Sequence, residues 1–302
     1  MTLSIFPVTP DFAAEIGDLD LRAPISAETL QAVRDAFVKY AVLIFPAQEL
    51  KPQHHLSFAR NFGPLERTVQ VAMKDQPLRV REEFADIGNM DAQGNVWKKD
   101  NRLRLFQMGN RLWHTDSSFK APTAYMSQLY ARSVAPIGGH TEFADLRAAY
   151  HGMTPSMKDR LRALIGEHSL LFSRAKLGFT NFSDEERRNY APVKRPLVRT
   201  LPESGRETLY LASHIGGIGG MADEAAMQLL DELTAHATQR QFVYTHRWRV
   251  GDLVMWDNRC TMHRGTEFED TRWPRDMLRA TTSDRADAFG VAEAETALAA
   301  DY

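Results

Sequence analysis

Cysteine is almost absent from this sequence, and long apolar runs are absent altogether. One cysteine among 302 residues cannot form an intrachain disulfide, so a reducing cytoplasm is the expected location. No stretch of about 18 apolar residues is present, so we expect no transmembrane helix. The amino terminus also lacks a basic segment followed by an apolar run, so we expect no signal peptide.

Net charge is nearly absent as well. The value of -2 at pH 7 gives no electrostatic reason to bind nucleic acid or an anionic membrane, and we expect neither as a partner. A hydrophobic content of 43% and a charged content of 25% are ordinary for a globular enzyme. The length suits one large domain over residues 1–302 with a weakly packed tail at 286–302. We expect it to assemble as a homo-oligomer.

Short strand-like segments dominate, and a few amphipathic helices lie between them. This pattern indicates a mainly β architecture with bracing helices, an α+β fold built around a double sheet. The glycines at 216–220 have no βαβ frame, so they predict a flexible turn rather than a phosphate-binding loop. Helices are expected at 27–40, with Ser26 as its cap, and at 53–61, 145–150, 155–164 and 223–237. Strands are expected at 41–45, 125–132, 197–201, 208–212, 241–248, 252–256 and 277–283.

The most informative stretch places His114 two residues before Asp116. On an extended strand, side chains at positions i and i+2 point to the same face, so both could reach one metal ion. The other interpretation is a strand-end histidine that hydrogen-bonds a nearby aspartate. A third ligand is needed for a catalytic metal, and His263 is the best candidate. Two histidines and one carboxylate form the facial triad of non-haem Fe(II) oxygenases.

Three further residues near His263 bear on this interpretation. Cys260 could be imagined as a ligand, but a buried packing role is favoured because no second cysteine exists. Arg275 and Arg279 lie four residues apart on an expected strand, so they should share a face. Two fixed guanidinium groups beside a metal suit the binding of carboxylates.

Several ordered motifs resemble the TauD/TfdA family of Fe(II)- and 2-oxoglutarate-dependent dioxygenases, most closely its 2,4-dichlorophenoxyacetate (aryloxyalkanoate) dioxygenase branch. The resemblance implies a double-stranded β-helix, or jelly-roll, core. It also implies Fe(II), 2-oxoglutarate as co-substrate, and O2. The resembling segments are 58–66, 112–119, 138–145, 196–200, 250–265 and 278–282.

The same resemblance assigns roles to individual positions. Thr141 and Arg275 would bind 2-oxoglutarate, with Arg272 as the alternative to Arg275. Arg279 would pair with the acidic group of the primary substrate, and Asn110 matches a family position near that substrate. His214 follows a strand and could face the same pocket, although a structural histidine is an equally good interpretation.

The irregular segment 66–111 precedes the metal motif. Long segments of this kind often cover a site, so we expect a lid, with a plain surface loop as the alternative. Val69 and Val71 in this segment could line a pocket for an aromatic ring.

We therefore expect a dioxygenase that hydroxylates the carbon next to the ether oxygen of an aryloxyacetate-type acid. The products would be a phenol and glyoxylate, with succinate and CO2. The same chemistry on taurine, an alkyl sulfonate, an alkyl sulfate or an arylacetate is the first alternative. A metal-dependent hydrolase or a cupin-like binding protein is the second, because two histidines and an aspartate also suit Zn(II).

Overall fold

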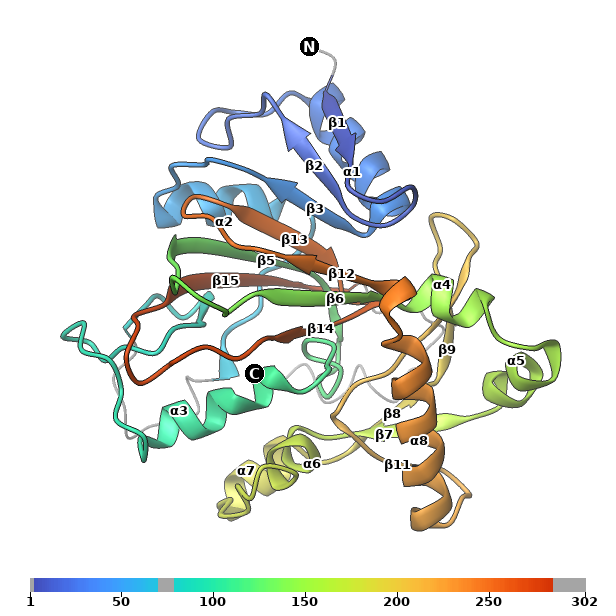
Figure 1. Ribbon diagram of the computed structural model, residues 1–302. Coiled ribbons are helices and arrows are strands. Elements are labelled where there is room, and N and C mark those ends of the chain that lie inside the picture. The colour runs from blue at the N-terminus through green and yellow to red at the C-terminus, as the bar shows by residue number, and fades with distance from the viewer. Residues whose placement is uncertain (1–2, 70–78, 285–302) are drawn as a thin grey trace.

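The computed structural model describes residues 3–69 and 79–284 (Figure 1). Its centre is a sheet of seven strands, and all neighbours in it pair antiparallel except the parallel pair β2 and β3. In spatial order the strands are β1 (Ser4–Pro7), β2 (Ala14–Gly17), β3 (Val42–Phe45), β13 (Leu253–Asp257), β5 (Ala124–Ser133), β15 (Asp276–Ser283) and β4 (Phe84–Asp86).

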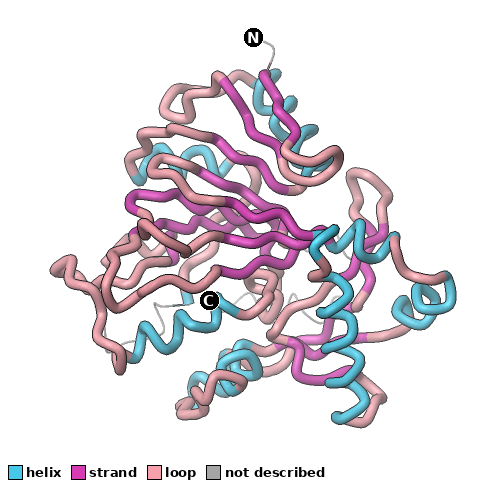
Figure 2. The backbone as a smooth tube through the Cα atoms, in the orientation of Figure 1, coloured by secondary structure: helices cyan, strands magenta, loops and turns pink. Residues whose placement is uncertain are grey.

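A smaller antiparallel sheet shares a core with the large one. It consists of β12 (Val243–His246), β6 (Thr141–Asp145) and β14 (Thr261–Gly265), in that order. Phe143 of β6 packs on Trp256 of β13, with ring centroids 5.5 Å apart. Leu129 and Val254 of the large sheet complete this buried cluster. Two such sheets around one core confirm the expected jelly roll (Figure 2).

The sequence of strand β13 is an almost continuous apolar run. Leu253 and Met255 point to one face and join the cluster beneath the helices, whereas Val254 and Trp256 point into the space between the sheets. Every residue of β13 is therefore buried. Alternation of polar and apolar residues is lost because both faces of this strand are covered.

Two helices cover the outer face of the large sheet (Figure 1). Helix α1 spans Ala27–Tyr40, and the side chain of Ser26 accepts a hydrogen bond from the backbone of Thr29, which confirms the predicted cap. Helix α2 spans Pro52–Arg60, close to the predicted range. Their aromatic side chains pack edge to face on the sheet, as Phe58 does on Phe45 of β3 at 5.3 Å.

A second group of elements packs beside the small sheet. Helix α8 (Asp223–Ala237) matches its predicted range and contributes an apolar stripe to a separate buried cluster. The other members are α4 (Leu146–His151), α5 (Pro155–Arg162), α6 (Leu170–Ala175), α7 (Asp184–Asn189), η3 (Arg240–Phe242), and the strands β7 (Ile165–His168), β8 (Val193–Pro196), β9 (Val198–Thr200), β10 (Glu207–Leu209) and β11 (Ile215–Ile218).

The glycine-rich stretch corrects one prediction. Gly216 and Gly217 belong to strand β11, which pairs antiparallel with β7, so the predicted turn is wrong for them; Gly219 and Gly220 do form a turn. The pairing has an irregularity next to Gly216, where a Cβ atom would lie 2.2 Å from the ring of Phe172. Glycine is required there because the aromatic ring approaches the backbone closely, and not because the chain has to turn.

The segment expected to form a lid contains β4, α3 (Arg102–Gln107) and the 3-10 helix η2 (Met108–Arg111). Strand β4 pairs with β15, so part of this segment belongs to the large sheet. Val71 and the predicted tail at 286–302 lie outside the described residues. Among the helices that the structure describes, none combines the length and the apolar character needed to cross a bilayer.

Candidate active site

The three predicted metal ligands meet beside the middle of β14, on the edge of that strand that does not pair with β6. The backbone N–H of His114 donates to the carbonyl of His263 at 3.0 Å, and that of His263 donates back at 2.8 Å. His114 forms an isolated bridge, and Asp116 lies in the turn that follows it. The expected extended strand is therefore wrong, and the bridge to β14 brings the ligands together instead.

The side chains converge closely. His114 Nε2 lies 3.7 Å from Asp116 Oδ1, and His263 Nε2 lies 3.7 Å from Asp116 Oδ2. One ligand atom from each residue lies within 4.8 Å of the other two. All three side chains are buried. The spacing matches three donors on one side of an ion, as the facial triad requires.

The protonation states also suit a divalent cation. Burial lowers the pKa of His114 and lowers the pKa of His263 well below its usual value, so both rings are neutral near pH 7. Burial is the largest single influence on Asp116 and would raise its pKa, but Arg279, the two histidines and the hydrogen bond from Ser127 together outweigh it and bring the pKa to about 2. His114 Nδ1 lies 2.8 Å from the carbonyl of Leu112 and must donate to it, so the lone pair sits on Nε2.

His114 Nε2 has no hydrogen-bond partner in the part of the chain that the structure describes. An unpaired buried imidazole nitrogen beside a carboxylate and a second imidazole is a donor set suited to a divalent metal. The residues present therefore fit a metal such as Fe(II). Cys260 is buried and lies outside the group of possible ligands, which confirms its packing role.

A hydrogen-bonded network that the sequence does not reveal orients Asp116. Ser127 of β5 donates to Asp116 Oδ2 at 2.8 Å, and Asn258 donates to Ser127 Oγ at 2.9 Å. The amide oxygen of Asn258 accepts from the Asp116 backbone at 3.2 Å and from the indole of Trp256 at 3.0 Å. The sequence alone does not identify Ser127 as part of the site, because a single serine in a strand belongs to no recognisable motif.

Two pockets meet at the triad and share Asn110, His114 and Arg279. We call them the first and the second pocket. The first also contains Thr141, Arg275, His263, Trp97, Ile87 and Phe268. The second also contains His214, Arg174, Asp116, Phe119, Leu170 and Val69. Val69 thus lies where it was expected, and the segment 66–111 lines both pockets.

The first pocket is suited to binding a carboxylate. Arg275 is buried and donates to the carbonyl of Ile87 at 3.1 Å, and no carboxylate among residues 3–69 and 79–284 pairs with its side chain. Burial lowers the pKa of Arg275 to about 10, so it remains charged at neutral pH. Trp248 donates to Thr141 Oγ at 2.9 Å, which leaves the hydroxyl hydrogen of Thr141 free to donate.

Arg279 lines both pockets from β15. One of its Nη atoms donates to Asp116 Oδ1 at 2.5 Å, and its Nε has no partner among the described residues. Arg275, which directly precedes β15, lines the first pocket together with Arg279. Arg272 is exposed, pairs with Glu269 at 3.1 Å and does not line either pocket, so the alternative assignment is wrong.

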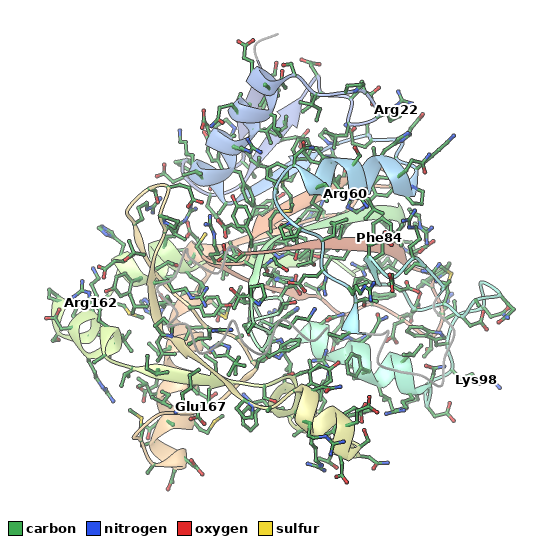
Figure 3. All side chains as sticks on the ribbon, turned by 180° about the vertical axis from the view of Figure 1, so that it is seen from behind. Arg22, Arg60, Phe84, Lys98, Arg162 and Glu167 are labelled. Atoms are coloured by element: carbon green, nitrogen blue, oxygen red, sulfur yellow. The ribbon has the colours of Figure 1, made fainter. Side chains whose placement is uncertain are left out.

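The second pocket brings together residues that the sequence only partly predicts. The ring of His214 lies 6.1 Å from that of His114, and its Nδ1 is 2.9 Å from Ser173 Oγ. Burial lowers the pKa of His214 well below its usual value, so it is a neutral wall residue. Lys98, by contrast, lies on an outer loop, is exposed and does not line the second pocket (Figure 3). Arg174 of α6 was not expected, because its partners are distant in the sequence.

This geometry can hold a divalent metal between two binding pockets, each with a buried guanidinium group. Arg275 lines the first pocket, and the second is partly apolar. Two small acids could therefore approach one metal from different sides. An arrangement of this kind suits a reaction that couples the conversion of a small acidic co-substrate to that of a second substrate.

Comparison with known proteins agrees with this geometry. Residues 4–281 match the family described as taurine catabolism dioxygenase TauD, TfdA family. The chain is 42% identical to the alpha-ketoglutarate-dependent 2,4-dichlorophenoxyacetate dioxygenase of Cupriavidus pinatubonensis, covering 95% of this chain and 99% of that one. It is 34% identical to the (S)-phenoxypropionate/alpha-ketoglutarate-dioxygenase of Sphingobium herbicidovorans, with 89% and 91% covered. The solved structure of AAD-2 with Mn(II) and N-oxalylglycine superposes with a TM-score of 0.91 at 43% identity, covering 95% and 100%.

Proposed function

The chain belongs to the TauD/TfdA family of dioxygenases, and from this premise we propose that it oxidises an aryloxyacetate-type acid with Fe(II), 2-oxoglutarate and O2. The carbon next to the ether oxygen would be hydroxylated, and the unstable product would separate into a phenol and glyoxylate. Succinate and CO2 would form from 2-oxoglutarate. Relatives named for 2,4-dichlorophenoxyacetate and phenoxypropionate support an aryloxy acid as the substrate.

One observation carries the proposal. The triad lies where two pockets meet, and each pocket contains a buried guanidinium without a carboxylate partner among the described residues, Arg275 in the first and Arg174 in the second. A metal-dependent hydrolase has no need for a buried anchor of this kind in the first pocket. The arrangement favours a metal enzyme that takes one acid as co-substrate and a second acid as substrate.

We assign the metal to His114, Asp116 and His263. Three protein ligands leave open positions on the ion, and bound Fe(II) would supply the activation of O2. The neutral state of the two imidazoles and the ionised state of Asp116 remove the need to release protons when the metal binds. Ser127 and Asn258 hold the carboxylate in a fixed orientation.

We assign 2-oxoglutarate to the first pocket. Arg275 would pair with the carboxylate farther from the metal, because a planar guanidinium binds a carboxylate through two parallel hydrogen bonds. Thr141 would donate its hydroxyl to the same carboxylate, since its oxygen already accepts from Trp248. Trp97 and Phe268 help to close the pocket against water.

We assign the primary substrate to the second pocket. Arg279 would pair with its acidic group, and Asn110 and His214, which also line this pocket, would contact the substrate. Phe119, Leu170 and Val69 give this pocket an apolar surface that suits an aromatic ring. Sulfonates and sulfates carry the same charge, so taurine, alkyl sulfonates and alkyl sulfates remain the alternatives that the test must include.

The test is succinate release over a panel of aryloxyacetates, arylacetates, alkyl sulfonates and alkyl sulfates. We expect succinate in proportion to phenol, only with Fe(II) and O2 present, and most rapidly with an aryloxyacetate. An anaerobic titration of the enzyme with Fe(II) and 2-oxoglutarate should give a visible metal-to-ligand charge-transfer band. Failure to form succinate with every acid in the panel would contradict the proposal.

Two further features are proposals of the same kind. A cytoplasmic location is supported by the single buried cysteine, because a reducing compartment keeps such a thiol free. A homo-oligomer is proposed for the assembly, and sedimentation equilibrium would test it.

A further inference from the structure

We propose that Arg174 is a specificity-determining residue of the second pocket, and that its guanidinium binds the carboxylate of the primary substrate together with Arg279. This inference rests on the proposed function, because it names a contact made by the same substrate. It assigns a role to helix α6, which neither the motifs nor the metal site involves.

Arg174 is buried without a counter-charge. Its side chain is 6% exposed, one Nη donates to Ser173 Oγ at 3.1 Å, and its Nε has no hydrogen-bond partner. Within the described ranges it forms no ion pair, and the nearby charge that acts on it is the positive charge of Arg279. A buried charge normally has a partner, because an unpaired one is strongly destabilising. An anionic ligand would supply the missing partner.

The surroundings fix where the guanidinium points. Its carbon lies 4.3 Å from the centroid of the Phe106 ring, a distance typical of a cation–π contact. On another side it packs against Gly109, where a Cβ atom would lie 2.0 Å from an Nη of Arg174. Any larger residue at position 109 would displace the guanidinium. Gly109 directly precedes Asn110, which lines both pockets.

The other cations of the second pocket already have acidic partners. Lys120 pairs with Glu66 at 2.6 Å, Arg67 pairs with Glu82 at 3.4 Å, and Arg279 pairs with Asp116 at 2.5 Å. Arg174 is the exception among those that the structure describes. We therefore expect the anionic group of the substrate to bind most strongly to Arg174, which has no acidic partner, and to make its second contact with Arg279.

The electrostatics support the same conclusion. Burial lowers the pKa of Arg174 to about 10, and the nearby charge of Arg279 contributes to this shift. Arg174 nevertheless remains positive near pH 7. The electrostatic repulsion between the two guanidinium groups would decrease when a carboxylate binds between them. The apolar walls formed by Phe119 and Leu170 would then hold the ring of the same molecule.

The experiment measures binding without turnover. The enzyme is loaded with Mn(II) and N-oxalylglycine, and phenoxyacetate or its neutral analogue phenoxyacetamide is titrated in a calorimeter. We expect Arg174→Met to weaken phenoxyacetate binding about 100-fold or more, with a much smaller effect on the amide. Arg174→Lys should restore part of the loss, because it returns the charge without the planar geometry.

Gly109→Ala provides an independent variant, since it keeps the arginine but displaces its guanidinium. It should weaken phenoxyacetate selectively, in the same direction as Arg174→Met. Arg188→Met, at an exposed position of α7, is the matched control and should change neither titration. The affinity for N-oxalylglycine should be unchanged in all four variants, because that ligand lies in the first pocket.

The outcomes separate this inference from the proposed function. Equal weakening of acid and amide, or no weakening of either, would show that Arg174 does not bind the carboxylate. An enzyme that binds phenoxyacetate through Arg174 but forms no succinate contradicts the proposed function alone. Succinate formation with unchanged binding in Arg174→Met contradicts this inference alone, and a wild-type enzyme that binds no phenoxyacetate contradicts both.

Discussion

Arg279 donates a hydrogen bond to Asp116 at 2.5 Å, so the proposed substrate anchor lies directly against a proposed metal ligand. The contact holds Oδ1 of the carboxylate, while Ser127 holds Oδ2. It also helps to keep Asp116 ionised, since burial raises the pKa but Arg279, together with the two histidines and Ser127, lowers it to about 2. The metal centre and the second pocket are thus physically connected, and changes at either residue should affect both.

Removal of any metal ligand should nearly abolish turnover. His114→Ala, Asp116→Ala and His263→Ala should each retain less than about a tenth of wild-type succinate formation, because two remaining ligands hold the ion poorly. Asp116→Glu should fail as well, since a longer side chain misplaces the carboxylate. Far-ultraviolet circular dichroism checks that each variant is folded. A folded variant that keeps more activity than this would show that its residue is not a ligand.

Arg275→Ala should act mainly on the co-substrate. Loss of the partner of a buried carboxylate costs roughly 3–5 kcal/mol, or about 100- to 1000-fold in affinity. The KM for 2-oxoglutarate should rise by about that factor, while the KM for the aryl acid changes little. Arg272→Ala is the control, because Arg272 is exposed and should leave both constants unchanged. Steady-state kinetics with each substrate varied in turn provide the measurement.

Arg279→Ala should show the opposite selectivity. The KM for the aryl acid should rise more than that for 2-oxoglutarate, and succinate should form without a matching amount of phenol. Arg279→Lys should recover part of the loss, because a point charge cannot donate two parallel hydrogen bonds. The ratio of phenol to succinate is the decisive number. A variant in which both substrates weaken equally would contradict the separation of roles between the two arginines.

His55 should make the protein less stable in mild acid. Its ring is buried against Phe84 and Tyr130, neither ring nitrogen has a partner among the described residues, and burial lowers the pKa to about 3. The unfolded chain binds a proton below pH 6.5 and the folded chain does not, so stability falls as the pH drops from about 6.5 towards about 3. The slope for one histidine is about 1.4 kcal/mol per pH unit.

His55→Phe should therefore reduce this loss. Urea unfolding at pH 7.5 and pH 5 should show a smaller difference in free energy of unfolding for the variant than for the wild type. His151→Phe is the matched control, since His151 is exposed and its charge is solvated in both states. An unchanged difference in His55→Phe would show that His55 binds its proton equally in the folded and the unfolded chain.

Local patterns in the sequence predicted part of the fold well. Helices α1 and α8 have the predicted bounds, because their apolar stripes and first-turn residues act within a few positions of the chain. Strands β6 and β14 were not predicted, since polar residues such as Thr141 and His263 interrupt their apolar pattern. Those residues are polar because they line the active site, and they therefore interrupt the alternation of apolar residues by which a strand is predicted.

The sequence by itself determined the chemistry of this protein, and the tertiary structure decided how that chemistry is arranged. Two histidines, an aspartate and two arginines could be identified as a set because their types and order are specific to metal and carboxylate binding. The bridge between His114 and His263, the support of Asp116 by Ser127, and the placement of Arg174 against Gly109 could not. Each depends on contacts between segments far apart in the chain, and only packing of the folded molecule brings such segments together.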